Sequence, residues 1–193
     1  MVSTRHHDCE QGIYESHLSC IRKGIFSGAK NVLVFEDDIF FDGFDPLRLK
    51  ECVSFLENNE WDAFFLGCLV SKSQKTSHPH VVKIRYRTLA HAYAVNRRFG
   101  IQLTGLPYRK IAFDDMLAHL DGTYYAIYPS FAFQDDSPSD NTAHLKLDNF
   151  RRLCGGLIPI QKRNEFYHRY RPLIICLHCL AVLFIGVVFV IAQ

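Results

Sequence analysis

NVLVFEDDIFF, residues 31–41, places three carboxylates directly after an apolar run. The four apolar residues Val32 to Phe35 predict a buried strand. Glu36, Asp37 and Asp38 follow this strand without a break. Because side chains alternate along an extended chain, we expect Glu36 and Asp38 to face one way and Asp37 the other.

Two carboxylates on one side of a strand end suit a hard divalent cation such as Mn²⁺ or Mg²⁺, which prefers oxygen ligands and can itself hold a diphosphate. In open α/β sheets the ligand crevice lies at the carboxyl ends of the strands, where this cluster falls. The alternative is that Asp37 and Asp38 only cap or solvate a turn.

The composition argues against nucleic acid as a partner and predicts a membrane-spanning segment. The chain has 193 residues and a net charge of +2, so it carries no single-sign field of the kind that binds nucleic acid. Leu173 to Ala192 holds no Lys, Arg, Asp or Glu. At 1.5 Å per residue these twenty residues are long enough to cross a ~30 Å hydrocarbon layer. A buried core helix is the alternative.

The residues that flank the apolar run predict its orientation. Lys162, Arg163, Arg169 and Arg171 precede it against the single acid Glu165. By the positive-inside rule, the soluble part is expected on the cytoplasmic side of the membrane.

The first eleven residues lack the apolar segment of a signal peptide, so no signal peptide is expected. Seven cysteines, an odd number, are expected to be reduced and mostly buried.

Three segments follow from these patterns: one domain over residues 1–155, a basic juxtamembrane linker over 156–172 and a membrane helix over 173–192. The order of apolar periodicities within the domain predicts an α/β fold with a mixed sheet flanked by helices. Helices are expected at 11–26, after Asp45-Pro46, at 97–103 and at 111–120. Strands are expected at 32–35, 61–67, 81–87, 90–95 and 124–133, with a polar loop at 71–80.

Several blocks occur in a fixed order along the chain. They are Glu10, Gly12, Ser16 and His17 on the first helix, Glu36 to Asp38, Trp61 to Gly67, His91 to Tyr93, Asp114 with Asp115, and Gln134 with Ser139 and Asp140. In this order and spacing they resemble glycosyltransferase family 25, the family of lipooligosaccharide and procollagen galactosyltransferases.

This resemblance implies a GT-A fold, a UDP-sugar donor, Mn²⁺ or Mg²⁺, and inversion at the anomeric carbon. Carried over, Glu36 and Asp38 are the metal ligands, and Asp37 supports them or meets the donor ribose. Asp114 or Asp115 is the general base that an inverting single displacement needs. Acids at a helix start are also favoured without any catalytic role, and that alternative stays open.

His17 and Asp140 are the other residues that the resemblance places at the donor site. A histidine on an apolar helix face is more often a satisfied core residue. Asp140 lies in SPSDN and can equally cap a turn.

The chain departs from the family pattern in two places. Family members carry a strand and an Arg-bearing loop well before the first helix block, whereas Met1 is only nine residues before Glu10. We therefore expect that this amino-terminal unit is missing and that the 193-residue chain alone is weakly active or inactive. Glu15 stands where the family has an apolar residue.

The leading hypothesis is a membrane-anchored, metal-dependent hexosyltransferase. It would move a hexose, with galactose as the expected sugar, from a UDP-sugar to a glycan acceptor such as a lipid-linked oligosaccharide. One alternative is a non-catalytic relative that binds or scaffolds. A further alternative is a metal-dependent phosphohydrolase, which uses similar acidic clusters.

Overall fold

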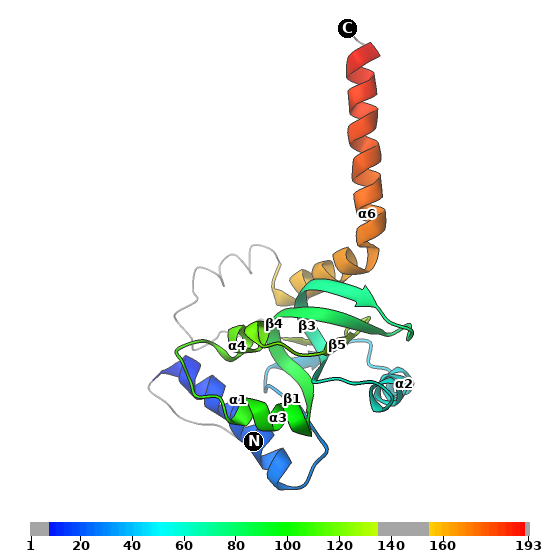
Figure 1. Ribbon diagram of the computed structural model, residues 1–193. Coiled ribbons are helices and arrows are strands. Elements are labelled where there is room, and N and C mark those ends of the chain that lie inside the picture. The colour runs from blue at the N-terminus through cyan, green and yellow to red at the C-terminus, as the bar shows by residue number, and fades with distance from the viewer. Residues whose placement is uncertain (1–7, 135–154, 192–193) are drawn as a thin grey trace.

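A mixed four-stranded sheet organises the domain. In the computed structural model, which describes residues 8–134 and 155–191, the strands lie in the order β1–β4–β3–β5 (Figure 1). Their bounds are Asn31–Phe35 for β1, Ala63–Lys75 for β3, Val81–Asn96 for β4 and Tyr124–Ile127 for β5. β3 and β5 are parallel and the other pairs are antiparallel. The mixed α/β class predicted from the sequence is confirmed.

β1 is buried on one face only, so the prediction of a fully buried strand was wrong. Val32 and Val34 are buried, whereas Leu33 and Phe35 are exposed. The reason is that α1, Cys9–Phe26, packs against only one side of the strand. Among the described residues β1 pairs with β4 alone, which leaves it at the edge of the sheet.

β3 and β4 are longer than predicted. The polar segment 71–75, expected as part of a loop, continues β3 and pairs with the start of β4. The two strands predicted at 81–87 and 90–95 are one strand, which passes through an irregular point at Leu89, where φ is +75°. β4 also pairs with β5, so β3, β4 and β5 each pair with the other two.

The predicted helices are present, and three begin at the side-chain caps that the sequence provides. Asp8 caps α1, Asp45 caps α2 (Pro46–Glu57) and Asn96 caps α3 (Arg97–Thr104). α4, Phe113–His119, has no side-chain cap. Each cap accepts hydrogen bonds from the first free N–H groups of its helix, so these starts depend on local sequence.

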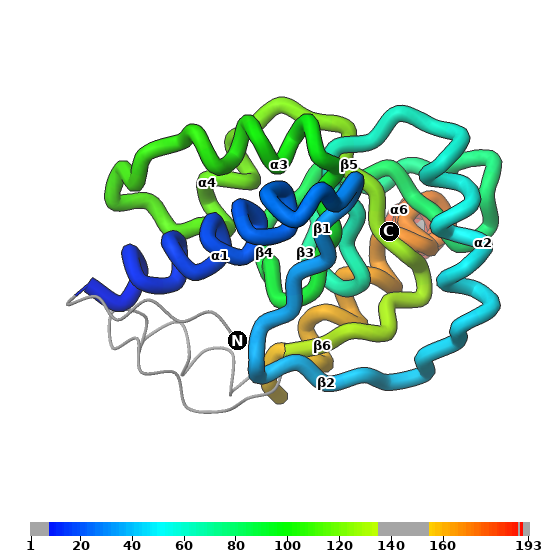
Figure 2. The backbone as a smooth tube through the Cα atoms, turned by 90° about the horizontal axis from the view of Figure 1, so that it is seen from below, coloured from blue at the N-terminus to red at the C-terminus, as the bar shows by residue number. Residues whose placement is uncertain are grey.

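The helices bury two clusters of apolar side chains. α1, α3 and α4 cover one cluster with Val32, Val34 and Tyr93 of the sheet, and α2 contributes Cys52 and Leu56 to a second cluster. Val53 of α2 is exposed. Figure 2 shows α1, α3 and α4 together and α2 apart from them.

A second, two-stranded sheet was not predicted. β2, Ile39–Phe41, pairs antiparallel with β6, Ala132–Gln134, and the register places Ile39 opposite Gln134. β2 starts directly after the acidic cluster. This pairing therefore brings a residue almost a hundred positions away to the end of β1.

α6, Leu157–Ile191, is one continuous helix that includes all but the first residue of the segment 156–172, which was expected as a linker. Its first turns pack on the domain: the buried side chain of Gln161 donates to the Ala132 carbonyl at 2.9 Å, and Asn164 bonds both the N–H and the C=O of Val70 at 3.0 Å. The Ser130 N–H donates to Glu165 at 2.9 Å. The helix then projects from the domain (Figure 1) and is a candidate membrane span by length and composition.

Candidate functional site

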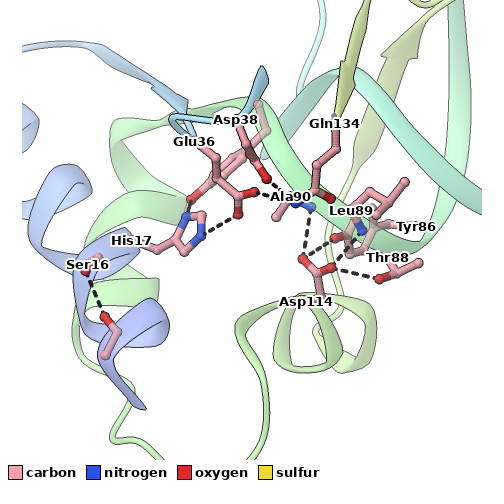
Figure 3. Close-up of polar contacts among 12 residues, drawn as sticks. Ser16, His17, Glu36, Asp38, Tyr86, Thr88, Leu89, Ala90, Asp114 and Gln134 are labelled. Atoms are coloured by element: carbon pink, nitrogen blue, oxygen red, sulfur yellow. Dashed lines mark hydrogen bonds and ion pairs between the residues drawn. The ribbon is translucent and has the colours of Figure 1, made fainter. Parts of the chain in front are cut away.

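The acidic end of β1 is held in an extended conformation by β4. The N–H of Glu36 donates to the carbonyl of His91 at 2.9 Å, which extends the β1–β4 ladder by one residue. The chain then turns at Asp37 and Asp38 into β2. Asp37 is exposed, while Glu36 and Asp38 are partly buried and lie on one side (Figure 3). Because residues 37 and 38 form a turn, this arrangement does not come from the alternation of an extended chain, which was the basis of the prediction.

Gln134 from β6 bridges the two carboxylates. Its Nε2 donates to Oδ2 of Asp38 at 2.9 Å and lies 3.4 Å from Oε2 of Glu36. No separate role was predicted for Gln134, because nothing in the local sequence indicates the pairing of β2 with β6. One amide thus fixes the spacing of both carboxylates.

His17 approaches Glu36 from α1 and is also part of the core. Its Nε2 lies 3.1 Å from Oε1 of Glu36, and its Nδ1 lies 3.0 Å from the Tyr93 hydroxyl. The imidazole stacks on the ring of Phe113, with centroids 4.2 Å apart, and only 5% of the residue is exposed. A neutral ring that donates from Nε2 to Glu36 and accepts at Nδ1 from Tyr93 satisfies both contacts. His17 is therefore both a buried core residue and a part of the site.

One oxygen of Asp38 differs from the other in having no partner in the described part of the chain. Among the described residues, no group hydrogen-bonds to its buried Oδ1. Burial raises the pKa of Asp38 above its ordinary value of 3.8; the hydrogen bond from Gln134 opposes this shift and the negative charge of Glu36 adds to it. A buried carboxylate with an open oxygen, beside a second carboxylate, is a site at which a cation would be stabilised.

Two carboxylates can supply only part of the ligands of such a site. Within residues 8–134 and 155–191, no group of three or more His, Cys, Asp or Glu side chains is placed to hold a metal ion. Mg²⁺ is commonly held by one or two carboxylates, with substrate phosphates and water completing its octahedron. Glu36 and Asp38 fit that pattern and do not fit an all-protein metal cage.

Asp114 has a different environment from Asp38. Its Oδ1 accepts from the Tyr86 hydroxyl at 2.8 Å and from the Ala90 N–H at 2.9 Å, and its Oδ2 accepts from Thr88 and the Leu89 N–H, both at 2.7 Å. Figure 3 shows the carboxylate directed at β4. Four donors occupy the oxygens of Asp114, so this geometry favours a structural role over that of a general base.

The remaining predicted residues are placed as follows. Asp115 is exposed on the first turn of α4. Asp140 lies outside the described residues. The site therefore brings together His17, Glu36 and Asp38, with Asp37 beside them, and adds Gln134.

No protein-family model matches the chain, and no curated protein sequence matches it.

The structural role of Asp114 can be tested by removing its carboxylate. Asp114→Ala leaves the N–H groups of Leu89 and Ala90 and two hydroxyls without their acceptor. Hydrogen bonds to a charged group contribute about 1.5–3 kcal/mol each and are not additive, so we expect a loss of roughly 3 kcal/mol or more in the free energy of unfolding. Urea denaturation followed by circular dichroism measures it.

The matched control is Asp115→Ala, which removes an exposed carboxylate from the next position of the same helix. It should leave the denaturation midpoint almost unchanged. Equal midpoints for the two variants would show that the four hydrogen bonds of Asp114 do not support β4.

The burial of Asp38 predicts a pH-dependent cost in stability. Its pKa is higher in the folded protein than the ordinary 3.8, so the folded state holds its proton more strongly. The free energy of unfolding then falls as pH rises from 3.8 through the folded pKa. Asp38→Asn removes this cost, so in metal-free buffer it should be more stable than the wild type at neutral pH and equally stable below pH 3.8.

Thermal unfolding with chelator present, recorded from pH 3 to pH 8, measures this difference. Asp37→Asn removes one negative charge from the adjacent exposed position and is the matched control. A constant difference between Asp38→Asn and the wild type across this range would contradict the assignment of the cost to the Asp38 carboxylate.

Proposed function

We propose that this protein is a metal-dependent glycosyltransferase with a GT-A-like fold. Glu36 and Asp38 would bind Mn²⁺ or Mg²⁺ and, through it, the diphosphate of a UDP-sugar. The observation that carries the proposal is the convergence of the two carboxylates at the end of β1, with Oδ1 of Asp38 buried and unpartnered among the described residues.

The surrounding side chains support this role by holding both carboxylates in place. His17 contacts one oxygen of Glu36, and Gln134 contacts the other and also Asp38. Outer contacts of this kind orient the ligands of a metal site. When bound, the cation would supply the positive charge that stabilises a departing diphosphate.

The other residues have narrower roles in the proposal. Asp37, exposed beside the pair, would support the two ligands or meet the donor ribose. The base that accepts the acceptor's proton would be Asp115, because the oxygens of Asp114 already accept four hydrogen bonds. A hexose, with galactose as the expected sugar, would pass to a glycan acceptor such as a lipid-linked oligosaccharide at the membrane.

The central test is metal binding by the full-length chain in detergent. Isothermal titration with Mn²⁺, with and without UDP, should show binding that UDP strengthens. Glu36→Gln and Asp38→Asn should each weaken it by roughly tenfold or more, as expected for losing a charged interaction of about 1.5–3 kcal/mol. Asp121→Asn, at an exposed position before β5, is the matched control and should bind as the wild type does.

The reaction products separate the proposal from its alternatives. A transferase releases UDP from UDP-galactose as the acceptor is glycosylated, and this release should be lost in Asp38→Asn. Release of inorganic phosphate from a phosphomonoester, dependent on the same residue, would instead indicate a phosphohydrolase. Metal-independent binding of UDP-galactose without turnover would favour a non-catalytic binding protein.

We further propose that the domain lies on the cytoplasmic side of the membrane. Lys162, Arg163, Arg169 and Arg171 lie on the domain side of the uncharged segment of α6 that begins at Leu173, and such residues are enriched in cytoplasmic segments. Protease added to sealed inverted vesicles should therefore degrade the domain, and protease added to right-side-out vesicles should not. The reverse pattern would refute this orientation.

A further inference from the structure

The outer edge of β1 carries a row of backbone groups that point away from the sheet. The N–H of Glu36 donates to His91, and the N–H of Arg97 donates to Lys30, so the even-numbered residues of this segment bond to β4. In an antiparallel pair, alternate residues direct both backbone groups to the partner. Asn31, Leu33 and Phe35 therefore direct theirs outward.

Within the described parts of the chain, no strand covers this edge, and its outward residues carry neither charge nor proline. Natural edge strands are blunted by charge, proline, a bulge or a covering element. The outward residues of β1 are uncharged, and Leu33 and Phe35 are 51% and 45% exposed. Among residues 8–134 and 155–191, no other strand pairs with β1 besides β4, whereas β3, β4 and β5 each have two or more partners in the same sheet.

We propose that β1 pairs antiparallel with β1 of a second copy, about a two-fold axis at Leu33, and so joins two sheets into one. In this register Leu33 lies opposite Leu33 of the second copy, and Asn31 lies opposite Phe35. These outward residues would form about six backbone hydrogen bonds across the axis. The interface is isologous, so it closes at two copies.

The charges that flank the strand favour this register. With Leu33 on the axis, Lys30 of each copy lies opposite Glu36 of the other, at both ends of the interface. Residues directly opposite have Cβ atoms about 4.5–5.5 Å apart, and opposite charges there are stabilising. The alternative register centred on Phe35 places Asp37 opposite Leu33 and pairs no charges. The strand is therefore complementary to itself in one register.

A consequence of this dimer is that each copy contributes a residue next to the other's acidic cluster. The Lys30 ammonium of the second copy would approach Glu36, the side chain that His17 and Gln134 hold. The dimer does not depend on the proposed transferase activity, because it rests on backbone pairing and on charges at the strand ends.

The mass of the full-length chain in detergent tests the proposal. Light scattering coupled to size exclusion should give a dimer of the 22.3 kDa chain. Leu33→Lys places two like charges directly opposite each other and should give a monomer at the same concentration. Because position 33 is exposed in one copy, circular dichroism should show that this variant keeps its fold.

Val53→Lys is the matched control. Val53 is 44% exposed on α2, away from β1, so this variant should remain a dimer. Lys30→Glu should weaken the dimer as well, because it opposes Glu36 with a second acid. A wild-type monomer, or a dimer that persists in Leu33→Lys, would overturn the proposal.

A cross-link tests the register. Opposed residues that share backbone hydrogen bonds have Cα atoms about 5.5 Å apart, within the range that a disulfide spans. Leu33→Cys should therefore form a 33–33 disulfide under mild oxidation, identified by mass spectrometry of the linked peptides. Val53→Cys should not cross-link to itself. Failure of Leu33→Cys to link in a protein that is dimeric would overturn the pairing at β1.

Discussion

The structure depends on one strand that changes its partners along its length. β4 pairs with β5 near its start and with β1 at its end, and it passes the irregular point at Leu89 between them. At that point the N–H groups of Leu89 and Ala90 bond to Asp114 instead of a neighbouring strand. Two amides that would otherwise cost free energy are satisfied by one carboxylate. The same strand then supplies the His91 carbonyl that holds Glu36, so the acidic site depends on this carboxylate without containing it.

The site also depends on the helix that leaves the domain. Gln161 of α6 bonds the Ala132 carbonyl, and Ala132 belongs to β6, which carries Gln134 to the two carboxylates. Gly67 of β3 leaves room for this contact, since a Cβ there would lie 2.7 Å from Nε2 of Gln161 and would collide with the Ala132 carbonyl oxygen. The first turns of α6 are therefore part of the domain's packing, and the candidate membrane span continues from them as one helix.

Features that depend on neighbouring residues could be predicted from the sequence, and features that depend on distant pairing could not. The caps Asp45 and Asn96 follow from local rules, and the structure has them. The polar residues 71–75 look like a loop because their propensity is weak, yet pairing with β4 makes them a strand. The contact of Gln134 with the two carboxylates could not be predicted, because it depends on the pairing of β6 with β2.

Two aspartates show why composition alone does not identify a ligand site. Asp38 and Asp114 both belong to acidic pairs in the sequence, and both are partly buried. Asp114 accepts hydrogen bonds from four donors, so both of its oxygens have partners within the fold. Asp38 meets one amide and a neighbouring carboxylate, and it keeps an oxygen that no described residue contacts. Because a buried charge is costly unless it is compensated, the aspartate that the described residues leave uncompensated is the one at which a bound cation would be stabilising.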